Sequence, residues 1–268
     1  MKVIFNQEII KEKDLLIGYN QKKYFSGDFV NVYCWVFQHR LIFWEDVYFQ
    51  LMANMRKMRI SIPMSYTPQM FENHIKLLCK ENEIYKGCIK ITVFRNLNTP
   101  SFIIEFLPYK DFFISADNKM EVYKDIIISP SLLSAISIFH PINLIAEQYA
   151  MENQLQEVIL LNGEKRISRS IFGNIFLVNN NVILSNPNSE GAFISCLKKN
   201  FLVFLRQKTE FIYKEECISP FQTQSANEIF ILSDQKGIIP INKIRKTTFN
   251  TEITHYLAKK FIGYALNA

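Results

Sequence analysis

The sequence contains little glycine and no glycine-rich phosphate loop. Only 8 of its 268 residues are glycine, and neither a GxxxxGK[ST] nor a GxGxxG motif occurs. Both motifs bind phosphate groups through backbone N–H groups on turns that need glycine. The chain therefore lacks the sequence signals of P-loop NTPases and of dinucleotide-binding Rossmann domains.

Cysteine and histidine are scarce and scattered. The 5 cysteines have no CxxC spacing, and the 4 histidines have no HxH or HxxxH spacing. An odd number of dispersed cysteines is typical of packing residues in a reducing compartment. We therefore predict no disulfide framework and no metal site.

Long apolar runs and charge blocks are also missing. No run approaches the roughly 18 residues of a membrane-spanning helix, and the N-terminus lacks the apolar stretch of a signal peptide. The net charge is +6, but Lys and Arg are mixed with Asp and Glu along the chain. Nucleic-acid-binding surfaces gather their cations in patches. We therefore expect no nucleic acid and no membrane as partner, and a cytoplasmic location by default.

The residues that are abundant predict a mixed α+β protein. Hydrophobic residues make up 49% of the chain, which suffices for a large core. The segments with strand patterns are 2–6, 14–19, 28–44 with a turn at 38–40, 88–95, 101–108, 157–162, 173–178, 181–186, 211–216, 228–233 and 237–242. The segments with a helical period are 44–58, 67–82, 143–153, 197–206 and 251–264. The mixed polar segment 110–124 separates an N-terminal lobe at 1–115 from a C-terminal lobe at 122–268.

Several segments in order carry a family resemblance. The clearest is 157–178, EVILLNGEKRISRSIFGNIFLV, followed by ANEIF at 226–230 and GIIPI at 237–241. Together they resemble the class IV aminotransferases, the fold-type IV pyridoxal-phosphate (PLP) enzymes, which include branched-chain and D-amino-acid aminotransferases and aminodeoxychorismate lyase. The resemblance covers nearly the whole chain. It implies the two-lobed D-amino-acid aminotransferase-like fold, with a cleft between the lobes, and a homodimer.

Where this resemblance places the catalytic groups, the chain carries other residues. In the family, a lysine forms a Schiff base with the cofactor and a carboxylate holds the pyridine nitrogen protonated. Aligned on Asn143 and Ala150, the lysine position is Ile136, which has no amine. The carboxylate position, five residues before Asn174, is Arg169. An arginine reverses the charge and cannot accept a hydrogen bond.

The residues that would hold the cofactor phosphate differ as well. The arginine of the family's phosphate-binding helix falls at Gln50, and a turn that offers backbone N–H groups and a threonine hydroxyl falls at 195–198. The remaining degenerate cradle positions are Ser195, Cys196, Leu197, Lys198 and Ser233. We therefore predict a family member that has lost its PLP site and holds no cofactor, with a binding or interaction role in the inherited cleft.

Two other functions stay open at this point. One is an active PLP-dependent aminotransferase or 4-amino-4-deoxychorismate lyase with an unrecognised lysine, for which Lys124 and Lys165 are the nearest candidates. The other is an enzyme with unrelated chemistry in the same cleft. In the first case the cofactor is pyridoxal phosphate. Because these alternatives stay open, the sequence does not decide whether the chain is an enzyme.

The candidates for anion binding are Arg95, Arg169 and Lys198. A guanidinium or ammonium group in the cleft would bind a substrate carboxylate or a small anionic metabolite. The competing interpretation is structural: Arg95 forms an ion pair at the end of a strand, and Arg169 and Lys198 are solvated or pair with Glu190 or Glu164. The sequence identifies neither the ligand nor a partner protein.

Overall fold

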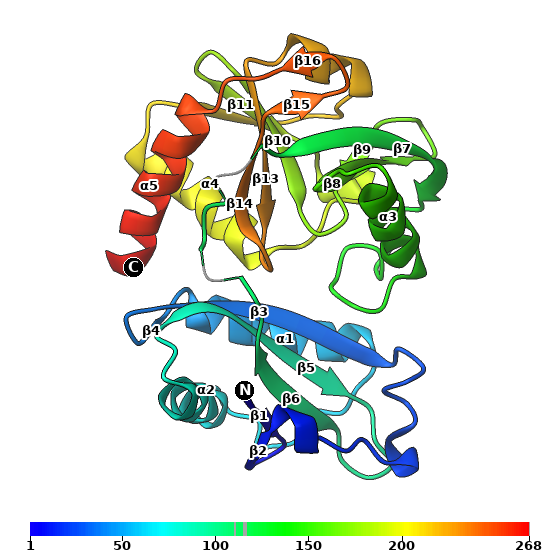
Figure 1. Cartoon of the computed structure of the whole chain (residues 1–268), viewed down its shortest axis with the longest axis vertical. Coiled ribbons are helices and arrows are strands. Elements are labelled where there is room, and N and C mark those ends of the chain that lie inside the picture. Colours follow the sequence, from blue (N-terminus) through cyan, green and yellow to red (C-terminus); the bar gives the residue numbers. More distant parts are fainter. Residues whose placement is uncertain (110, 115–116, 268) are drawn as a thin grey trace. The chain divides into compact units, whose positions relative to one another are not determined.

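The computed structural model describes residues 1–109, 111–114 and 117–267, which form two compact units (Figure 1). Unit 1 consists of Met1–Phe112 together with Ile136–Phe139, and unit 2 consists of Phe113–Ala135 and His140–Ala268. The short segment Ile136–Phe139 thus joins unit 1, although the predicted lobes assign it to the C-terminal half.

Unit 1 contains a six-stranded antiparallel sheet with the order β2-β1-β6-β5-β3-β4. Helix α1 packs against β3, and α2 packs against β1 and β6. The strands are β1 (Lys2–Phe5), β2 (Glu8–Lys11), β3 (Phe29–Phe37), β4 (Arg40–Leu41), β5 (Lys86–Phe94) and β6 (Ser101–Phe106). The helices are α1 (Trp44–Lys57), α2 (Pro68–Asn82) and the short 3₁₀ helices η1 (Glu12–Asp14) and η2 (Tyr19–Gln21).

Local signals in the sequence explain most of these boundaries. The Thr67 hydroxyl caps α2 by accepting a hydrogen bond of 3.1 Å from Met70 N, with Pro68 at the first helical position. The predicted turn between β3 and β4 is confirmed. The strand predicted at 14–19 is wrong, because the chain there follows η1 without joining the sheet and Leu16 is 83% exposed.

Unit 2 contains two five-stranded sheets. The first has the order β12-β11-β10-β13-β14, and the second has the order β16-β15-β7-β8-β9. The strands of the first are β10 (Asn174–Asn179), β11 (Val182–Ser185), β12 (Ile212–Glu215), β13 (Glu228–Ser233) and β14 (Gly237–Ile241). Those of the second are β7 (Lys119–Ile128), β8 (Glu157–Asn162), β9 (Ile167–Arg169), β15 (Lys243–Ile244) and β16 (Thr247–Thr248).

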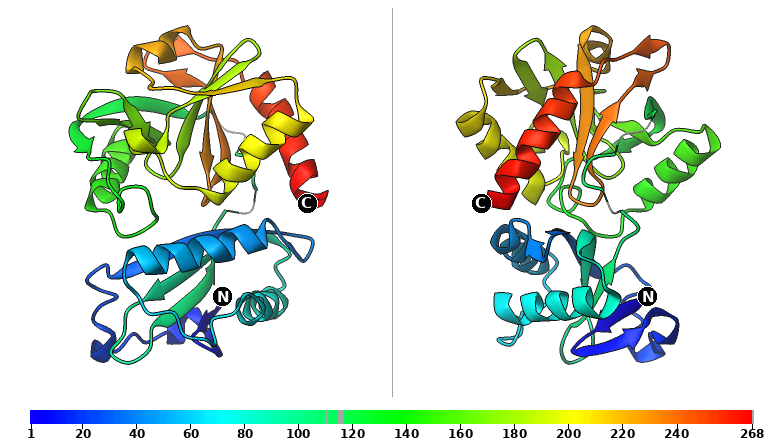
Figure 2. Two further views of the ribbon diagram at one scale, coloured as in Figure 1. Left: turned by 180° about the vertical axis from the view of Figure 1, so that it is seen from behind. Right: turned by 60° about the vertical axis from the view of Figure 1, so that its left-hand side comes forward.

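Helices cover the outer faces of these sheets. Figure 2 shows α4 (Cys196–Lys208) and α5 (Glu252–Asn267) side by side against β13. On the second sheet, α3 (Pro141–Glu152) packs against β8 through Ala146 and Ala150. Two 3₁₀ helices, η3 (Asn188–Glu190) and η4 (Pro220–Ser225), complete the unit.

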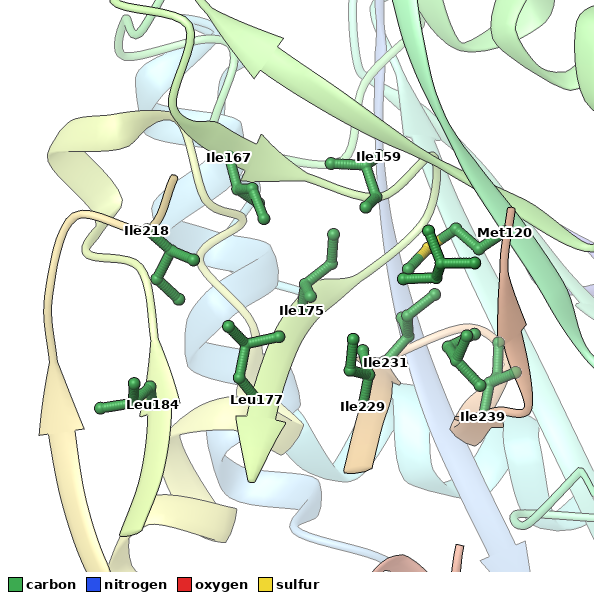
Figure 3. Packing of buried hydrophobic residues seen from close by; sticks show 12 residues of the cluster. Met120, Ile159, Ile167, Ile175, Leu177, Leu184, Ile218, Ile229, Ile231 and Ile239 are labelled. Carbon is green, nitrogen blue, oxygen red and sulfur yellow. The ribbon is translucent and has the colours of Figure 1, made fainter. Parts of the chain in front are cut away.

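Strand alternation builds two apolar layers in unit 2. On β10, Ile175 and Leu177 point into a core between the two sheets, which Figure 3 shows with partners such as Ile159 and Met120. The intervening Phe176 points to the opposite face, where its ring lies 4.9 Å from that of Phe230 and 5.6 Å from that of Phe201 on α4. The continuous apolar run of β10 is therefore buried on both faces.

Strand β7 was not predicted. It lies in the segment that the sequence suggests as a boundary, and it carries exposed Lys119, Lys124 and Asp125. Met120 and Tyr123 are nevertheless buried, each in a different hydrophobic cluster of unit 2, and β7 pairs in parallel with β8. The charged residues at its exposed positions interrupt the apolar pattern by which a strand is predicted from sequence.

Candidate functional site

The N-terminus of α4 is capped by a carboxylate from another part of the chain. Asp234, in the turn between β13 and β14, accepts hydrogen bonds from Cys196 N at 3.1 Å and from Leu197 N at 2.9 Å. Its Oδ1 also accepts a hydrogen bond of 2.6 Å from the Ser195 hydroxyl. In turn, Ser195 Oγ accepts from Lys198 N at 2.9 Å and caps the helix. The negative charge also matches the positive end of the helix dipole.

These N–H groups are the ones that the sequence identifies as the phosphate-binding turn. A phosphate would have to displace the Asp234 carboxylate, and it would meet a like charge in doing so. The residues present therefore do not fit a phosphate at this helix end. Sequence reasoning did not find Asp234, although it stands directly after the predicted cradle residue Ser233.

Ser233 holds its own turn together. Its hydroxyl donates a hydrogen bond of 2.7 Å to Phe172 O and accepts one of 3.1 Å from Lys236 N. The side chain thus links the β13–β14 turn to the turn at 170–173 that precedes β10.

Arg169 lies at the end of β9 and is 1% exposed. Its Nη1 donates to Ser170 O at 2.9 Å and to Ile171 O at 2.8 Å, and its Nη2 donates to Asn143 Oδ1 at 2.8 Å. The guanidinium carbon lies 4.2 Å from the centroid of the Phe193 ring. Among the described residues, Nε has no hydrogen-bond partner. Burial lowers the pKa of Arg169 to about 9, although the charge of Glu157 opposes this effect.

Glu157 provides the buried negative charge near Arg169. The carboxylate is fully buried and lies 2.8 Å from Nζ of Lys236, while its other oxygen accepts a hydrogen bond of 3.0 Å from Ile171 N. The Lys236 ammonium also lies 4.5 Å from the centroid of the Phe172 ring. The Glu157 carboxylate therefore stabilises two cations: it forms an ion pair with Lys236, and its negative charge favours the charged form of Arg169. Neither Glu157 nor Lys236 was singled out from the sequence.

Asn174 positions the aromatic ring that covers Arg169. Its Nδ2 donates to Phe193 O at 3.1 Å, and its Oδ1 accepts from Phe193 N at 2.9 Å. This two-way pairing fixes the backbone of Phe193. The asparagine noted in the sequence resemblance thus has a structural role.

The Lys198 ammonium is bound by residues outside α4. Its side chain is 7% exposed, and its Nζ donates to Asn186 O at 2.9 Å and to Glu215 at 3.3 Å. Burial lowers the pKa of the Lys198 ammonium. The partner is Glu215 rather than the predicted Glu190 or Glu164, and Glu190 pairs with Arg166 instead.

Three further predicted positions, Ile136, Gln50 and Arg95, lie in unit 1. Ile136 is fully buried, and Gln50 is half-buried on α1. Arg95 donates from Nε to Asp28 at 2.8 Å and from its two terminal nitrogens to Arg59 O and Met58 O, both at 2.7 Å. All three nitrogens of Arg95 are engaged within unit 1, and its role in binding an anion stays a prediction.

The structure places the candidate lysines Lys124 and Lys165 together. Both line a pocket of unit 2 that contains neither Arg169 nor Glu157. In the part of the chain that the structure describes, no group of three His, Cys, Asp or Glu side chains is arranged to hold a metal ion. None of the described helices is both long and apolar enough to cross a bilayer.

Comparison with known proteins adds a family match and a fold match. The profile of the amino-transferase class IV family matches residues 31–244. A D-alanine aminotransferase of Staphylococcus epidermidis is 22% identical over 256 residues, which cover 91% of this chain and 89% of that protein. The branched-chain amino acid aminotransferase of Escherichia coli superposes with a TM-score of 0.87 at 14% identity, over 98% of this chain and 93% of the other. A putative 4-amino-4-deoxychorismate lyase of Legionella pneumophila gives a TM-score of 0.82 at 15% identity, over 95% and 97%. These likenesses confirm the predicted α+β fold of the fold-type IV enzymes.

Proposed function

The chain belongs to the class IV aminotransferase family, and from this premise we propose that it is a member that no longer carries out PLP-dependent catalysis. In this proposal, unit 2 keeps the inherited scaffold as a binding site for a small organic anion. The observation that carries the proposal is the hydrogen bonding of Asp234 to the α4 N-terminus.

Electrostatics at α4 supports this proposal. A helix N-terminus attracts a phosphate because its N–H groups are free and its dipole is positive. Here the Cys196 and Leu197 N–H groups already donate to a carboxylate of the same chain. A carboxylate of the same chain loses no translational entropy when it binds here, whereas a cofactor phosphate would lose it. The cradle is therefore filled by Asp234.

The environment of Arg169 supports the loss of the pyridine partner. A carboxylate at this position, as the family resemblance implies, would accept a hydrogen bond from the protonated ring nitrogen, but the Arg169 guanidinium can only donate hydrogen bonds. Three of its hydrogen bonds go to Ser170, Ile171 and Asn143. A cation at this position opposes protonation of a pyridine nitrogen. The protonated ring is the form of the cofactor that accepts electrons, so the cation disfavours that form.

The same arginine gives the site a chemical preference. The buried Arg169 Nε has no partner among the described residues, and an unpartnered buried donor costs about 1–3 kcal/mol. A carboxylate oxygen that reached Nε would satisfy it with a charge-assisted hydrogen bond. We therefore assign an organic carboxylate as the ligand class of this site.

The proposal is tested by incubating the purified full chain with excess pyridoxal phosphate, reducing it with borohydride and mapping the peptides by mass spectrometry. We expect no stoichiometric attachment to a single lysine, no visible Schiff-base absorption band, and no transamination of D-alanine. Stoichiometric attachment to one lysine, together with amino-acid turnover, would overturn the proposal and support the active-enzyme alternative. The mapped lysine would then identify the residue that the sequence did not reveal.

A matched pair of variants isolates the role of Asp234. Asp234→Ala leaves the N–H groups of Cys196 and Leu197 without their acceptor, so we expect inorganic phosphate to bind this variant and not the unchanged chain. Asp125→Ala removes an exposed carboxylate of β7 and serves as the control. If phosphate binds the unchanged chain as tightly as the Asp234→Ala variant, the carboxylate does not close the cradle.

The assembly and location of the protein remain part of the proposal. We propose a homodimer in the cytoplasm, following the family resemblance and the sequence composition. Light scattering of the purified chain measures its oligomeric state, and a monomer would contradict this part without affecting the argument from Asp234.

A further inference from the structure

Unit 2 contains a pocket of about 730 Å³. Its volume falls within the range of about 300–1,000 Å³ that is common for small-molecule sites. The walls come from β7, β8, the turn after β8, η4, and the segment around β15 and β16. Basic and apolar side chains line it, among them Lys124, Lys165, Leu161, Ile244, Phe221 and Phe249. The pocket shares no residue with the Arg169, Glu157 and Asp234 cluster.

The charges that line this pocket are all of one sign. Lys124, Lys165, Arg245 and Lys246 contribute four cations, and none of the described residues that line the pocket is acidic. These cations come from strand β7 and from two separate turns, so they surround the space from different elements. A concave surface lined by one sign of charge raises the local concentration of counter-ions.

The backbone conformation of the pocket turns is unusual. Lys165 and Arg245 both have a left-handed backbone, with φ of 57° and 54°, a conformation that residues with a side chain adopt only rarely. Asn162 fixes the first turn, because its Oδ1 accepts hydrogen bonds of 3.1 Å from both Glu164 N and Arg166 N. Lys165 is therefore held in place by its own turn.

The rest of the lining is apolar. Val122 and Leu161 are half-buried, and Ile244 is buried. At the rim, Phe221 is 79% exposed and Ile127 is 54% exposed. Apolar side chains held beside a cavity, with cations between them, are suited to a ligand that has an apolar body and an anionic head.

We propose that this pocket binds a small amphipathic organic anion, with its phosphate or carboxylate group near Lys124, Lys165, Arg245 and Lys246 and its aromatic or alkyl body against Phe221, Phe249 and Ile127. The site is separate from the family's positions, so the proposal is independent of the one made for Arg169 and Asp234.

Calorimetric titration of the full chain tests the ligand class with three probes: naphthyl phosphate, naphthol and inorganic phosphate. We expect naphthyl phosphate to bind at least about tenfold more tightly than either of the other two, because only it contacts both the cations and the apolar walls. Its affinity also falls as salt is added. No binding of naphthyl phosphate, or equal binding of naphthol, would overturn the proposal.

Variants locate the binding to this pocket. Lys124→Gln and Lys246→Gln each weaken naphthyl phosphate binding about three- to tenfold, and Lys259→Gln on α5, also an exposed lysine, leaves it unchanged. Phe221→Ala weakens binding by a similar factor, while Met151→Ala on α3, another exposed apolar residue, does not. All the substituted residues are exposed, so folding is preserved. Equal affinities in the pocket variants and their controls would overturn the assignment.

Discussion

The Ser195 hydroxyl and the Asp234 carboxylate are joined by a hydrogen bond of 2.6 Å. Ser195 is the N-cap residue of α4, and Asp234 lies in the turn that follows β13, so the bond connects a helix end to a turn 39 positions later in the sequence. The same carboxylate accepts from two backbone N–H groups of α4. Asp234 is thus a long-range cap of this helix.

Removing this cap lowers the stability of the chain. We expect Asp234→Ala to reduce the free energy of unfolding by about 1–2 kcal/mol, because the N–H groups of Cys196 and Leu197 lose their acceptor. Asp234→Asn keeps an acceptor oxygen but loses the charge, and it should cost about half as much. Urea unfolding followed by circular dichroism measures both. A loss no larger than that of the exposed Asp125→Ala control would show that Asp234 contributes nothing as a cap.

Substitution of Glu157 should lower the free energy of unfolding more than substitution of its partner Lys236. Glu157→Gln leaves the buried Arg169 and the partly buried Lys236 without a counter-charge, and we expect it to cost about 3 kcal/mol. Lys236→Met should cost about 1 kcal/mol, because Glu157 keeps the field of Arg169 and the hydrogen bond from Ile171 N.

A double-mutant cycle checks this imbalance. The Glu157→Gln/Lys236→Met variant should lose less stability than the sum of the two single variants, since only one uncompensated cation remains. Unfolding free energies from urea titration provide all four corners of the cycle. Strict additivity would mean that Glu157 and Lys236 do not interact.

The ion pair of Glu190 and Arg166 makes stability depend on pH. Arg166 donates to both carboxylate oxygens, at 2.6 and 2.9 Å, and these hydrogen bonds hold the pKa of Glu190 below its usual range, while burial opposes them. The folded pKa therefore lies below the unfolded value of about 4.3. This stabilisation is fully present above the unfolded pKa and is lost as the pH falls through the folded pKa.

We accordingly expect the stability gap between the unchanged chain and Glu190→Gln to be largest at about pH 7 and to shrink towards about pH 3. Unfolding free energies measured across this range test the expectation. Glu164→Gln, which alters an exposed carboxylate two positions before Arg166, is the control. A gap that stays constant with pH would exclude this coupling.

Residues with strong local patterns made much of the fold predictable. Strands β8 and β13 were predicted with their observed bounds, because their runs of Val, Ile, Leu and Phe are buried. The start of α2 followed from Thr67 and Pro68. Strand β7 escaped detection, since its outward positions carry charged residues.

Contacts between distant parts of the sequence could not be predicted in this way. The resemblance indicated that the helix start at Ser195 had lost its family residues, but no local rule connects it to Asp234. Likewise, the partners of Lys198 and Arg169 depend on how β11, β12 and the turn at 170–173 fold together. The sequence therefore identified candidate positions, whereas the charged and polar partners of these residues are known only from the structure.

A close backbone approach in unit 1 gives a last prediction. Gly27 has φ of 73°, and a Cβ at this position would lie 2.8 Å from Cβ of Phe139. Phe139 belongs to the segment Ile136–Phe139, which is tied to unit 1 by the hydrogen bond of 2.8 Å from Asn31 N to Ser137 O. Gly27→Ala should therefore reduce stability by about 2 kcal/mol, through the strained backbone and the displaced segment.

The matched control is Gly263→Ala in α5, where a Cβ meets no atom within 4 Å. Alanine is preferred over glycine in a helix, so this change should raise stability by up to about 1 kcal/mol. Both tryptophans of the chain, Trp35 and Trp44, lie in unit 1. Urea unfolding followed by tryptophan fluorescence therefore reports on unit 1, and Gly27→Ala should shift this transition to lower urea. An unshifted fluorescence transition would mean that Phe139 moves aside without cost and that the segment Ile136–Phe139 does not stabilise unit 1.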